Sequence, residues 1–178
     1  MGQPDAELMQ RWQQGDASAF EEVVRRWQQP IARFLARHVG RAELVADLSQ
    51  EVFLRVYLAR GRYRENGAFS TWLYQIALNV ARDAGRRRRV LPKPLDDHEV
   101  PAHGAPVQSL CEQRETQQIV TRVLADLAEP LREVLVLRHY EGLSFEEISR
   151  LLDVPASTLK SRFAAALNQL RDRLKDAV

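Results

Sequence analysis

The sequence predicts an all-α protein made of two small helical domains joined by a flexible linker, the C-terminal one containing a helix-turn-helix. Three observations lead to this prediction. Apolar residues recur at the i, i+3, i+4 and i+7 spacing of helices through most of the 178 residues. No long alternation of β-branched residues indicates a strand. Four of the eight prolines fall within residues 91–109, where the helical pattern is lost. We therefore expect domains at residues 1–90 and 111–178, with the linker at 91–110.

Two helices are expected at the start of the N-terminal domain. Pro4 begins the first helix and Gly15 ends it. Asp16 stands at the N-cap position of the second helix, and Gly40 ends its apolar pattern. Pro30 lies inside this pattern. Because proline lacks an N–H and clashes with the preceding turn, we expect it to kink the helix or to split it in two.

Two further helices follow, separated by a basic and aromatic loop. A stripe of apolar residues predicts a helix from Ala42 to Ala59, and the loop spans residues 61–67. The next helix starts near Ser70 and ends in four consecutive arginines, residues 86–89. The segment 53–89 carries nine arginines against two acidic residues, although the formal charge of the whole chain is only +2. Positive charge is therefore concentrated at this end of the N-terminal domain.

The C-terminal domain has the pattern of a helix-turn-helix. Pro130 is well placed as the first residue of a helix that breaks at Gly142. Ser144 and Glu147 form a capping box that begins a short helix. Pro155 lies in the following turn, and a longer amphipathic helix comes next. An ordinary helical hairpin has the same outline, so this pattern alone leaves both interpretations open.

The outward face of the last helix favours DNA binding. Its buried face is predicted to consist of Leu159, Phe163, Ala166, Leu167, Leu170 and Leu174. The residues then expected to point outward are Ser157, Ser161, Ala164, Ala165 and Asn168, with Lys160 and Arg162 on the flanks. Small side chains allow close approach to base edges, and flanking cations suit the phosphates on either side of a major groove.

A second candidate nucleic-acid surface lies at the end of the N-terminal domain. The fourth helix has a polar stripe formed by Gln75, Asn79, Arg82, Asp83 and Arg86. The loop before it carries Arg60, Arg62, Tyr63 and Arg64. Cations that follow a backbone and rings that accept an unstacked base are the parts of a single-strand binding surface. The alternative for the arginine run is a solvated helix end that complements the helix dipole. For the three tryptophans, core packing is the favoured interpretation.

Composition excludes several classes of protein. No apolar run approaches the roughly 20 residues of a membrane span, so no stable membrane insertion is expected. The single cysteine, Cys111, precludes an internal disulfide, and the four histidines form no i, i+4 pair. We therefore expect no metal or other cofactor. No carboxylate cluster, phosphate-binding glycine loop or nucleophile–base pair is evident, so no enzymatic activity is expected. The chain is expected to be soluble and cytoplasmic.

Two groups of motifs carry a family resemblance. Those of the N-terminal domain are DLSQEVFLRVY at 47–57 and FSTWLYQIALN at 69–79, followed by Asp83. Those of the C-terminal domain are PLREVL at 130–135, GLSFEEI at 142–148 and VPASTLKSR at 154–162. In residues, order and separation the chain resembles the extracytoplasmic-function (ECF) RNA polymerase sigma factors, group IV of the housekeeping-type sigma family. The resemblance covers nearly all of the chain apart from the linker.

The resemblance implies two roles for the N-terminal domain, which is similar to the domain that binds the clamp of core RNA polymerase and opens the −10 promoter element. The core-binding residues that it implies are Asp47, Gln50, Glu51 and Phe53. The residues that it implies for −10 binding are Arg62, Tyr63, Arg64, Asn79, Arg82, Arg86 and Arg87. Extruding a base costs a few kcal/mol, so a fitted pocket is needed to recover that cost. The alternative for the carboxylates is that they only solvate the helix surface.

The C-terminal domain is similar to the sigma domain that docks on the polymerase flap and reads the −35 duplex. Its implied contact residues are Ser157, Thr158, Lys160, Ser161 and Arg162. The sequence departs from the family at residues 163–166, where FAAA replaces a segment that is often basic. Fewer phosphate contacts are expected there. The resemblance also implies an anti-sigma factor as a regulatory partner.

The resulting prediction is a sigma factor that binds core RNA polymerase, recognises promoter DNA in duplex and single-stranded form, and promotes strand opening. The alternative is an autonomous helix-turn-helix regulator that reads a pseudo-palindrome as a dimer. No dimerisation helix is evident, and this alternative leaves the core-binding motif unexplained.

Overall fold

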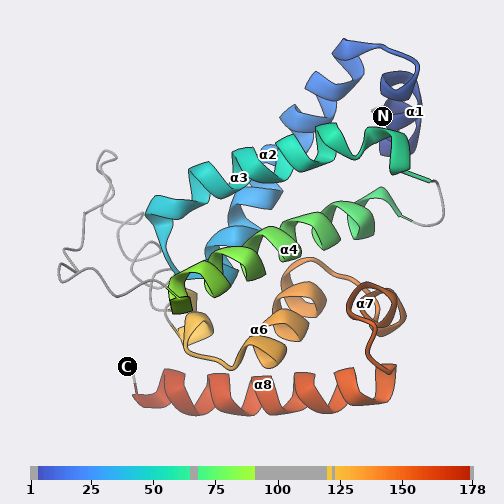
Figure 1. The fold of residues 1–178 in the computed structure, drawn as a ribbon. Coiled ribbons are helices and arrows are strands. Elements are labelled where there is room, and N and C mark those ends of the chain that lie inside the picture. Colours follow the sequence, from blue (N-terminus) through green and yellow to red (C-terminus); the bar gives the residue numbers. More distant parts are fainter. Residues whose placement is uncertain (1–3, 65–67, 91–119, 122, 177–178) are drawn as a thin grey trace, which may run out of the picture.

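The computed structural model describes residues 4–64, 68–90, 120–121 and 123–176, and every regular element within them is helical (Figure 1). The predicted linker and Cys111 lie outside the described residues. The elements are α1 Asp5–Gln13, α2 Ala17–Val39, α3 Ala42–Leu58, the 3₁₀ turn η1 Arg60–Arg62, α4 Phe69–Val90, α6 Glu129–Leu135, the π-helical turn η2 Val136–Tyr140, α7 Phe145–Leu152 and α8 Ala156–Asp176. Residues 120–121 and 123–125 are also helical. The all-α prediction is confirmed. No helix among these residues has both the length and the apolarity to cross a bilayer.

The start of α2 follows the prediction, and its middle excludes one of the two outcomes predicted for Pro30. The Asp16 carboxylate accepts a hydrogen bond from the Ser18 N–H at 3.0 Å, as an N-cap does. Pro30 lies inside one continuous helix of 23 residues, so of the two predicted outcomes the split does not occur, and the kink stays a prediction. Ile31, Phe34 and Leu35, which follow the proline directly, are fully buried. Their packing offsets the cost of about 3 kcal/mol that proline imposes on a helix interior.

The end of α2 approaches the C-terminal part of the chain closely. Gly40 ends the helix in the left-handed region, with a φ of 68°, and its N–H donates to the Ala36 carbonyl at 3.1 Å. A Cβ atom at position 40 would lie 2.5 Å from the Cβ of Ala125. Glycine is therefore required here both by the backbone conformation and by the neighbouring helix.

The helix-turn-helix has the predicted boundaries. Pro130 is the second residue of α6 rather than the first, and the helix continues as η2. At the start of α7, the Glu147 N–H donates to Ser144 Oγ at 3.1 Å, and the Ser144 N–H donates to the Glu147 carboxylate at 2.8 Å. This completes the predicted capping box. Asp153, with a φ of 56°, ends α7 and turns the chain into α8.

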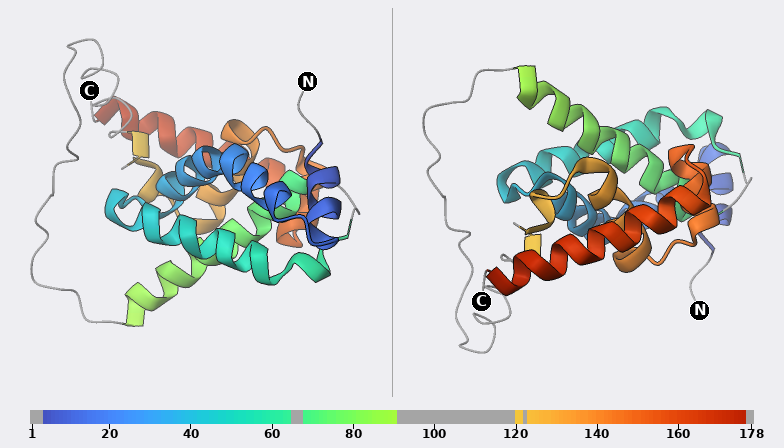
Figure 2. Two further views of the ribbon diagram at one scale, coloured as in Figure 1. Left: turned by 90° about the horizontal axis from the view of Figure 1, so that it is seen from above. Right: turned by 90° about the horizontal axis from the view of Figure 1, so that it is seen from below.

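Helix α4 lies at the centre of the molecule. In Figure 1 it runs between α2 and α3 on one side and α6 and α7 on the other. Figure 2 shows α8 on the outer face of the C-terminal helices. One contiguous apolar core joins both halves of the chain, since it contains Leu73 and Leu78 of α4 together with Val134, Ile148 and Leu159. The two predicted domains are therefore packed against each other.

Candidate nucleic-acid interface

The outer face of α3 carries polar groups at one end and apolar groups at the other. Asp47 and Gln50 are exposed, and Glu51 is half-buried. Leu54 and Leu58 continue the same face at helical spacing and are 57% and 72% exposed. The predicted core-binding face therefore extends into an apolar patch that the sequence analysis missed. The signal for it was present, because two leucines stand outside the predicted buried stripe.

Phe53 and Tyr57 occupy the flanks of this helix rather than its most exposed line. Phe53 is half-buried and packs against the core. The Tyr57 ring is 47% exposed and lies with its centre 5.5 Å from that of Trp12 and 5.7 Å from that of Phe20. Each ring is therefore partly exposed and partly packed.

Ion pairs join α3 to α4. Arg55 donates to the Glu51 carboxylate at 2.5 Å and to the Asp83 carboxylate at 2.9 Å. Asp83 also accepts a hydrogen bond from Arg86. Burial alone would raise the pKa of Asp83, but the hydrogen bonds from Arg86 and Arg55 outweigh burial and lower it. Arg87 lies 4.0 Å from Glu51. The predicted polymerase-binding and DNA-binding faces thus share one charge network.

A pocket lies where α3, η1 and α4 meet. Its volume is about 320 Å³, which is in the range of about 300–1,000 Å³ typical of small-molecule sites. It is lined by Arg55, Leu58, Ala59, Arg62, Ile76 and Asn79. Two of these, Arg62 and Asn79, were predicted to contact the −10 element. The walls combine an apolar floor with hydrogen-bonding groups, which suits a planar ring with polar edges.

The loop before α4 is held from two directions. Gln13 of α1 donates to the Arg60 carbonyl at 2.6 Å and to the Tyr63 carbonyl at 3.2 Å. The exposed side chain of Arg64 donates to the Gly61 carbonyl at 2.9 Å. Residues 65–67, which complete the predicted loop, lie outside the described residues.

Tyr63 does not present the ring surface that the sequence analysis expected. Its side chain is only 3% exposed, and its ring centre lies 5.1 Å from that of Trp72 and 5.9 Å from that of Phe69. Aromatic packing of this kind is favoured over exposure because it removes a large apolar area from water. In this arrangement Tyr63 supports the loop from inside. The core-packing interpretation of the tryptophans holds, since Trp12 is buried in the core and Trp27 and Trp72 are half-buried and pack against it.

The arginines of α4 differ in their surroundings. The side chains of Arg86 and Arg87 are 69% and 68% exposed. Arg82 instead donates two hydrogen bonds to the Glu133 carboxylate of α6, at 2.6 and 2.8 Å, and lies 3.9 Å from Glu129. This pairing across 51 residues of sequence was not predicted. Hydrogen bonding to Glu133 raises the pKa of Arg82, which therefore stays charged.

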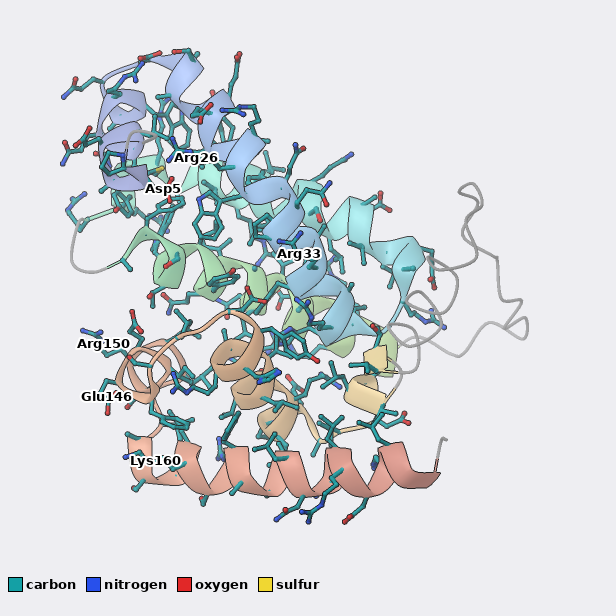
Figure 3. The ribbon with its side chains drawn as sticks, turned by 180° about the vertical axis from the view of Figure 1, so that it is seen from behind. Asp5, Arg26, Arg33, Glu146, Arg150 and Lys160 are labelled. Atoms are coloured by element: carbon teal, nitrogen blue, oxygen red, sulfur yellow. The ribbon has the colours of Figure 1, made fainter. Side chains whose placement is uncertain are left out.

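The first turns of α8 carry all five residues predicted to contact the −35 element. Ser157, Lys160 and Ser161 are exposed, and Thr158 and Arg162 are half-buried on either side of the fully buried Leu159. Figure 3 shows Lys160 at the start of α8, at the same end of the molecule as Glu146 and Arg150 of α7. Farther along α8, Leu167 is 40% exposed although the apolar pattern placed it inside, and Ala166 is buried.

Comparison with known families matches two segments of the chain. Residues 23–90 match "Sigma-70 region 2", and residues 117–170 match "Sigma-70, region 4". The first segment contains α3, α4 and the pocket, and the second contains the helix-turn-helix.

Similar proteins and structures cover nearly the whole chain. The ECF RNA polymerase sigma-E factor of Haemophilus influenzae is 33% identical over 96% of this chain and 95% of its own length. The RNA polymerase sigma-H factor of Pseudomonas aeruginosa is 34% identical over 91% of this chain and 89% of its own length. Among solved structures, CnrH in complex with the cytosolic domain of CnrY has a TM-score of 0.76 at 24% identity, covering 98% of this chain and 99% of that one. The sigma factor RpoE in complex with the anti-sigma factor NepR from Bartonella quintana has a TM-score of 0.68 at 20% identity. The match covers 88% of this chain and 96% of that one.

Proposed function

The chain belongs to the ECF RNA polymerase sigma factors. On this basis we propose which of its surfaces contacts polymerase, which contacts the −10 element and which contacts the −35 element. A sigma factor binds core RNA polymerase, recognises promoter DNA and initiates transcription. The protein has this function, and an autonomous helix-turn-helix regulator is not favoured. The assignments that follow concern which residues carry each contact, and the domains are proposed at residues 1–90 and 111–178 with a linker at 91–110.

The outer face of α3 is proposed to dock on the polymerase clamp. Asp47, Gln50 and Glu51 offer hydrogen-bond acceptors, and Phe53 adds a half-buried ring. Interfaces gain most of their free energy from apolar groups removed from water, with polar groups setting the orientation. The exposed Leu54 beside these residues therefore belongs to the same proposed contact.

The pocket between α3 and α4 is proposed to accept an extruded base of the −10 element. Arg62 and Asn79 line it and offer a cation and an amide to the edge of a base. Arg64, Arg82, Arg86 and Arg87 are proposed to hold the phosphates of the single strand around it. Tyr63 supports the loop by packing and does not itself stack on a base in this assignment. This pocket, flanked by cations, is the observation that carries the −10 assignment.

The start of α8 is proposed to read the −35 duplex. Ser157, Ser161 and Lys160 are exposed at its first two turns, and Thr158 and Arg162 flank them. The N-terminal residues of a recognition helix make the base contacts in helix-turn-helix proteins. The apolar residues 163–166 leave the second half of the helix with few phosphate contacts.

The mode of action is proposed to be non-enzymatic. Binding free energy is divided among polymerase, −35 duplex and −10 single strand, so neither DNA site needs high affinity alone. The site of action is the cytoplasm, where bacterial polymerase works. One similar structure is the sigma factor RpoE in complex with the anti-sigma factor NepR, and another is CnrH in complex with the cytosolic domain of CnrY. An anti-sigma factor is accordingly proposed as a partner of this chain.

In vitro transcription tests the function directly. Core RNA polymerase is incubated with a library of genomic promoter fragments, with and without the protein, and transcript starts are mapped. We expect a discrete set of starts that depend on the protein and share −35 and −10 sequences. A gel shift of the same fragments without polymerase is the control. Tight dimeric binding there, with no protein-dependent starts, would identify an autonomous regulator and contradict the proposal.

A further inference from the structure

The contact between α4 and α6 suggests more than a packing role for two acidic residues. Arg82, which the proposed function assigns to the phosphates of the −10 strand, forms a bidentate pair with Glu133 at 2.6 and 2.8 Å. Glu129 of the same helix lies 3.9 Å from the same guanidinium. A guanidinium binds carboxylate and phosphate through the same pair of parallel N–H donors. The two acidic groups therefore occupy the place that a phosphate would take.

The Glu133 carboxylate is fixed in this position. Its side chain is only 5% exposed, whereas that of Arg82 is 33% exposed. A strand phosphate cannot approach the inner donors of Arg82 while α6 remains against α4. Removing α6 leaves both groups in water, where each is solvated, so the pair can separate without leaving an unpaired buried charge.

A second polar contact holds the same two halves together. Tyr74 of α4 donates a hydrogen bond to Glu141, the residue that follows η2. Arg37 of α2 lies 3.5 Å from the same carboxylate, and its guanidinium lies 4.1 Å from the ring centre of Tyr140. The Glu141 side chain is 7% exposed. The halves are thus joined by directed contacts at two places.

Shape complementarity adds a third contact without charge. Gly40 at the end of α2 approaches Ala125 so closely that a Cβ atom on residue 40 would lie 2.5 Å from the Ala125 Cβ. The apolar core continues through the same interface, from Leu73 of α4 to Val134 of α6 and Ile148 of α7. Interior packing of this density resists small displacements, so the arrangement is one state rather than a loose collision of two domains.

We propose that this closed arrangement is autoinhibitory: Glu133, with Glu129, acts as an internal substitute for a DNA phosphate on Arg82, and the −10 surface becomes competent only when the C-terminal half leaves α4. The inference rests on the proposed role of Arg82 in −10 binding. Docking on polymerase, which holds the two halves at separate sites, supplies the free energy for opening. Binding to DNA in the absence of polymerase is reduced by the fraction of molecules that are open.

The direct test is single-strand binding by the full-length protein without polymerase. The probe is a fluorescein-labelled 12-nucleotide DNA of mixed sequence, and anisotropy gives its affinity. Glu133→Gln keeps the size of the side chain but loses the charge that holds Arg82. We expect it to bind the probe about tenfold more tightly than the wild type, which corresponds to about 1.4 kcal/mol. Small-angle scattering should show a larger radius of gyration.

Matched variants separate the mechanism from a general change in charge. Glu146→Gln removes the same charge from an exposed position on α7 and should bind as the wild type does. The double variant Glu133→Gln, Arg82→Gln should not bind the probe more tightly than the wild type, because the increase in affinity requires the freed Arg82 guanidinium. Ala125→Leu opens the interface at Gly40 without changing charge, and it should also bind more tightly. If Glu133→Gln does not fold, as judged by circular dichroism, Ala125→Leu carries the test.

The outcomes distinguish this inference from the function on which it rests. Unchanged affinity and radius in both Glu133→Gln and Ala125→Leu, or a gain that survives the loss of Arg82, would overturn the autoinhibitory contact. In that case wild-type protein would still direct transcription by core polymerase. Absence of protein-dependent transcription would overturn the proposed function instead.

Discussion

His38 is the clearest case of a single residue whose environment changes its chemistry. The ring is fully enclosed near the end of α2, and its Nδ1 lies 3.0 Å from the Phe34 carbonyl, to which it donates as a neutral tautomer. Burial lowers the pKa of His38 from 6.5 to about 3, and the nearby guanidinium of Arg132 contributes in the same direction. The ring is therefore neutral in the folded protein near neutral pH.

The low pKa of His38 predicts a loss of stability in mild acid. The unfolded chain binds a proton at the ordinary pKa of about 6.5, whereas the folded chain does not, so stability is complete above that pH and falls as pH drops. Between pH 7 and pH 5 we expect His38 to remove about 2 kcal/mol from the free energy of unfolding, at about 1.4 kcal/mol per pH unit. Urea unfolding at both pH values measures this.

A variant isolates the contribution of His38. His38→Leu should make the free energy of unfolding less dependent on pH by that amount, even if its stability at pH 7 is lower. His139→Leu changes an exposed histidine and serves as the control. Equal pH dependence in wild type and His38→Leu would show that the ring does not remain neutral in the folded state.

Charge reversal on α3 tests the proposed polymerase contact at single residues. Gln50→Lys and Glu51→Lys place cations where acceptors are proposed to face the clamp, and we expect core binding to weaken on the order of tenfold or more for the pair. Gln50→Lys alone is informative because Glu51 also pairs with Arg55 within the chain. Glu21→Lys, an exposed change on α2, is the control. Core binding that stays at the wild-type level, measured by native gel or fluorescence, would contradict the assignment.

At the scale of elements, the capping box contributes to the stability of α7. Ser144→Ala removes the acceptor for the Glu147 N–H, and the loss of an N-cap costs about 1 kcal/mol. We expect a lower melting temperature and faster amide exchange in α7. Ser149→Ala, within the same helix but without a capping role, is the comparison. A Ser144→Ala protein as stable as the wild type would show that tertiary packing alone holds the start of this helix.

The pocket between α3 and α4 predicts a defect in strand opening with little effect on folding. Asn79 is exposed, so Asn79→Ala should leave the free energy of unfolding nearly unchanged. Open-complex formation, measured by permanganate reactivity with core polymerase, should fall about tenfold, since one well-placed base contact is worth about 1–3 kcal/mol. Gln29→Ala, which changes an exposed amide on α2 outside any proposed contact, is the matched control. Equal defects in both variants would argue against a base in the pocket.

A structural feature could be predicted when the interaction that produces it joins residues close together in the sequence. The Asp16 N-cap and the Ser144–Glu147 capping box were predicted because each involves residues at most three apart. Of the two outcomes predicted at Pro30, the split does not occur, because the buried residues beside the proline belong to a core assembled from distant helices. The Arg82–Glu133 pair could not be predicted, because the two residues are 51 positions apart and the sequence does not show that their helices pack together. The burial of Tyr63 escaped prediction because its neighbours in sequence, Arg62 and Arg64, are typical of an exposed loop.

At the scale of the whole molecule, the shared core predicts that the two halves unfold together. All three tryptophans, Trp12, Trp27 and Trp72, lie in the N-terminal half, so their fluorescence reports on that half alone. Far-ultraviolet circular dichroism reports on helices in both halves. We expect the two signals to give the same urea midpoint. A second midpoint seen only by circular dichroism would show that the halves unfold independently.

The approach of α2 to Ala125 also restricts how the protein can vary. At position 40, an L-amino acid meets a strained backbone, and its side chain meets a methyl group that lies 85 residues away in the sequence. A screen of random variants for the compact, closed structure should therefore recover almost no replacement of Gly40. At position 125, glycine and serine should be the favoured survivors, so two sites in separate homology regions share a single limit on side-chain size.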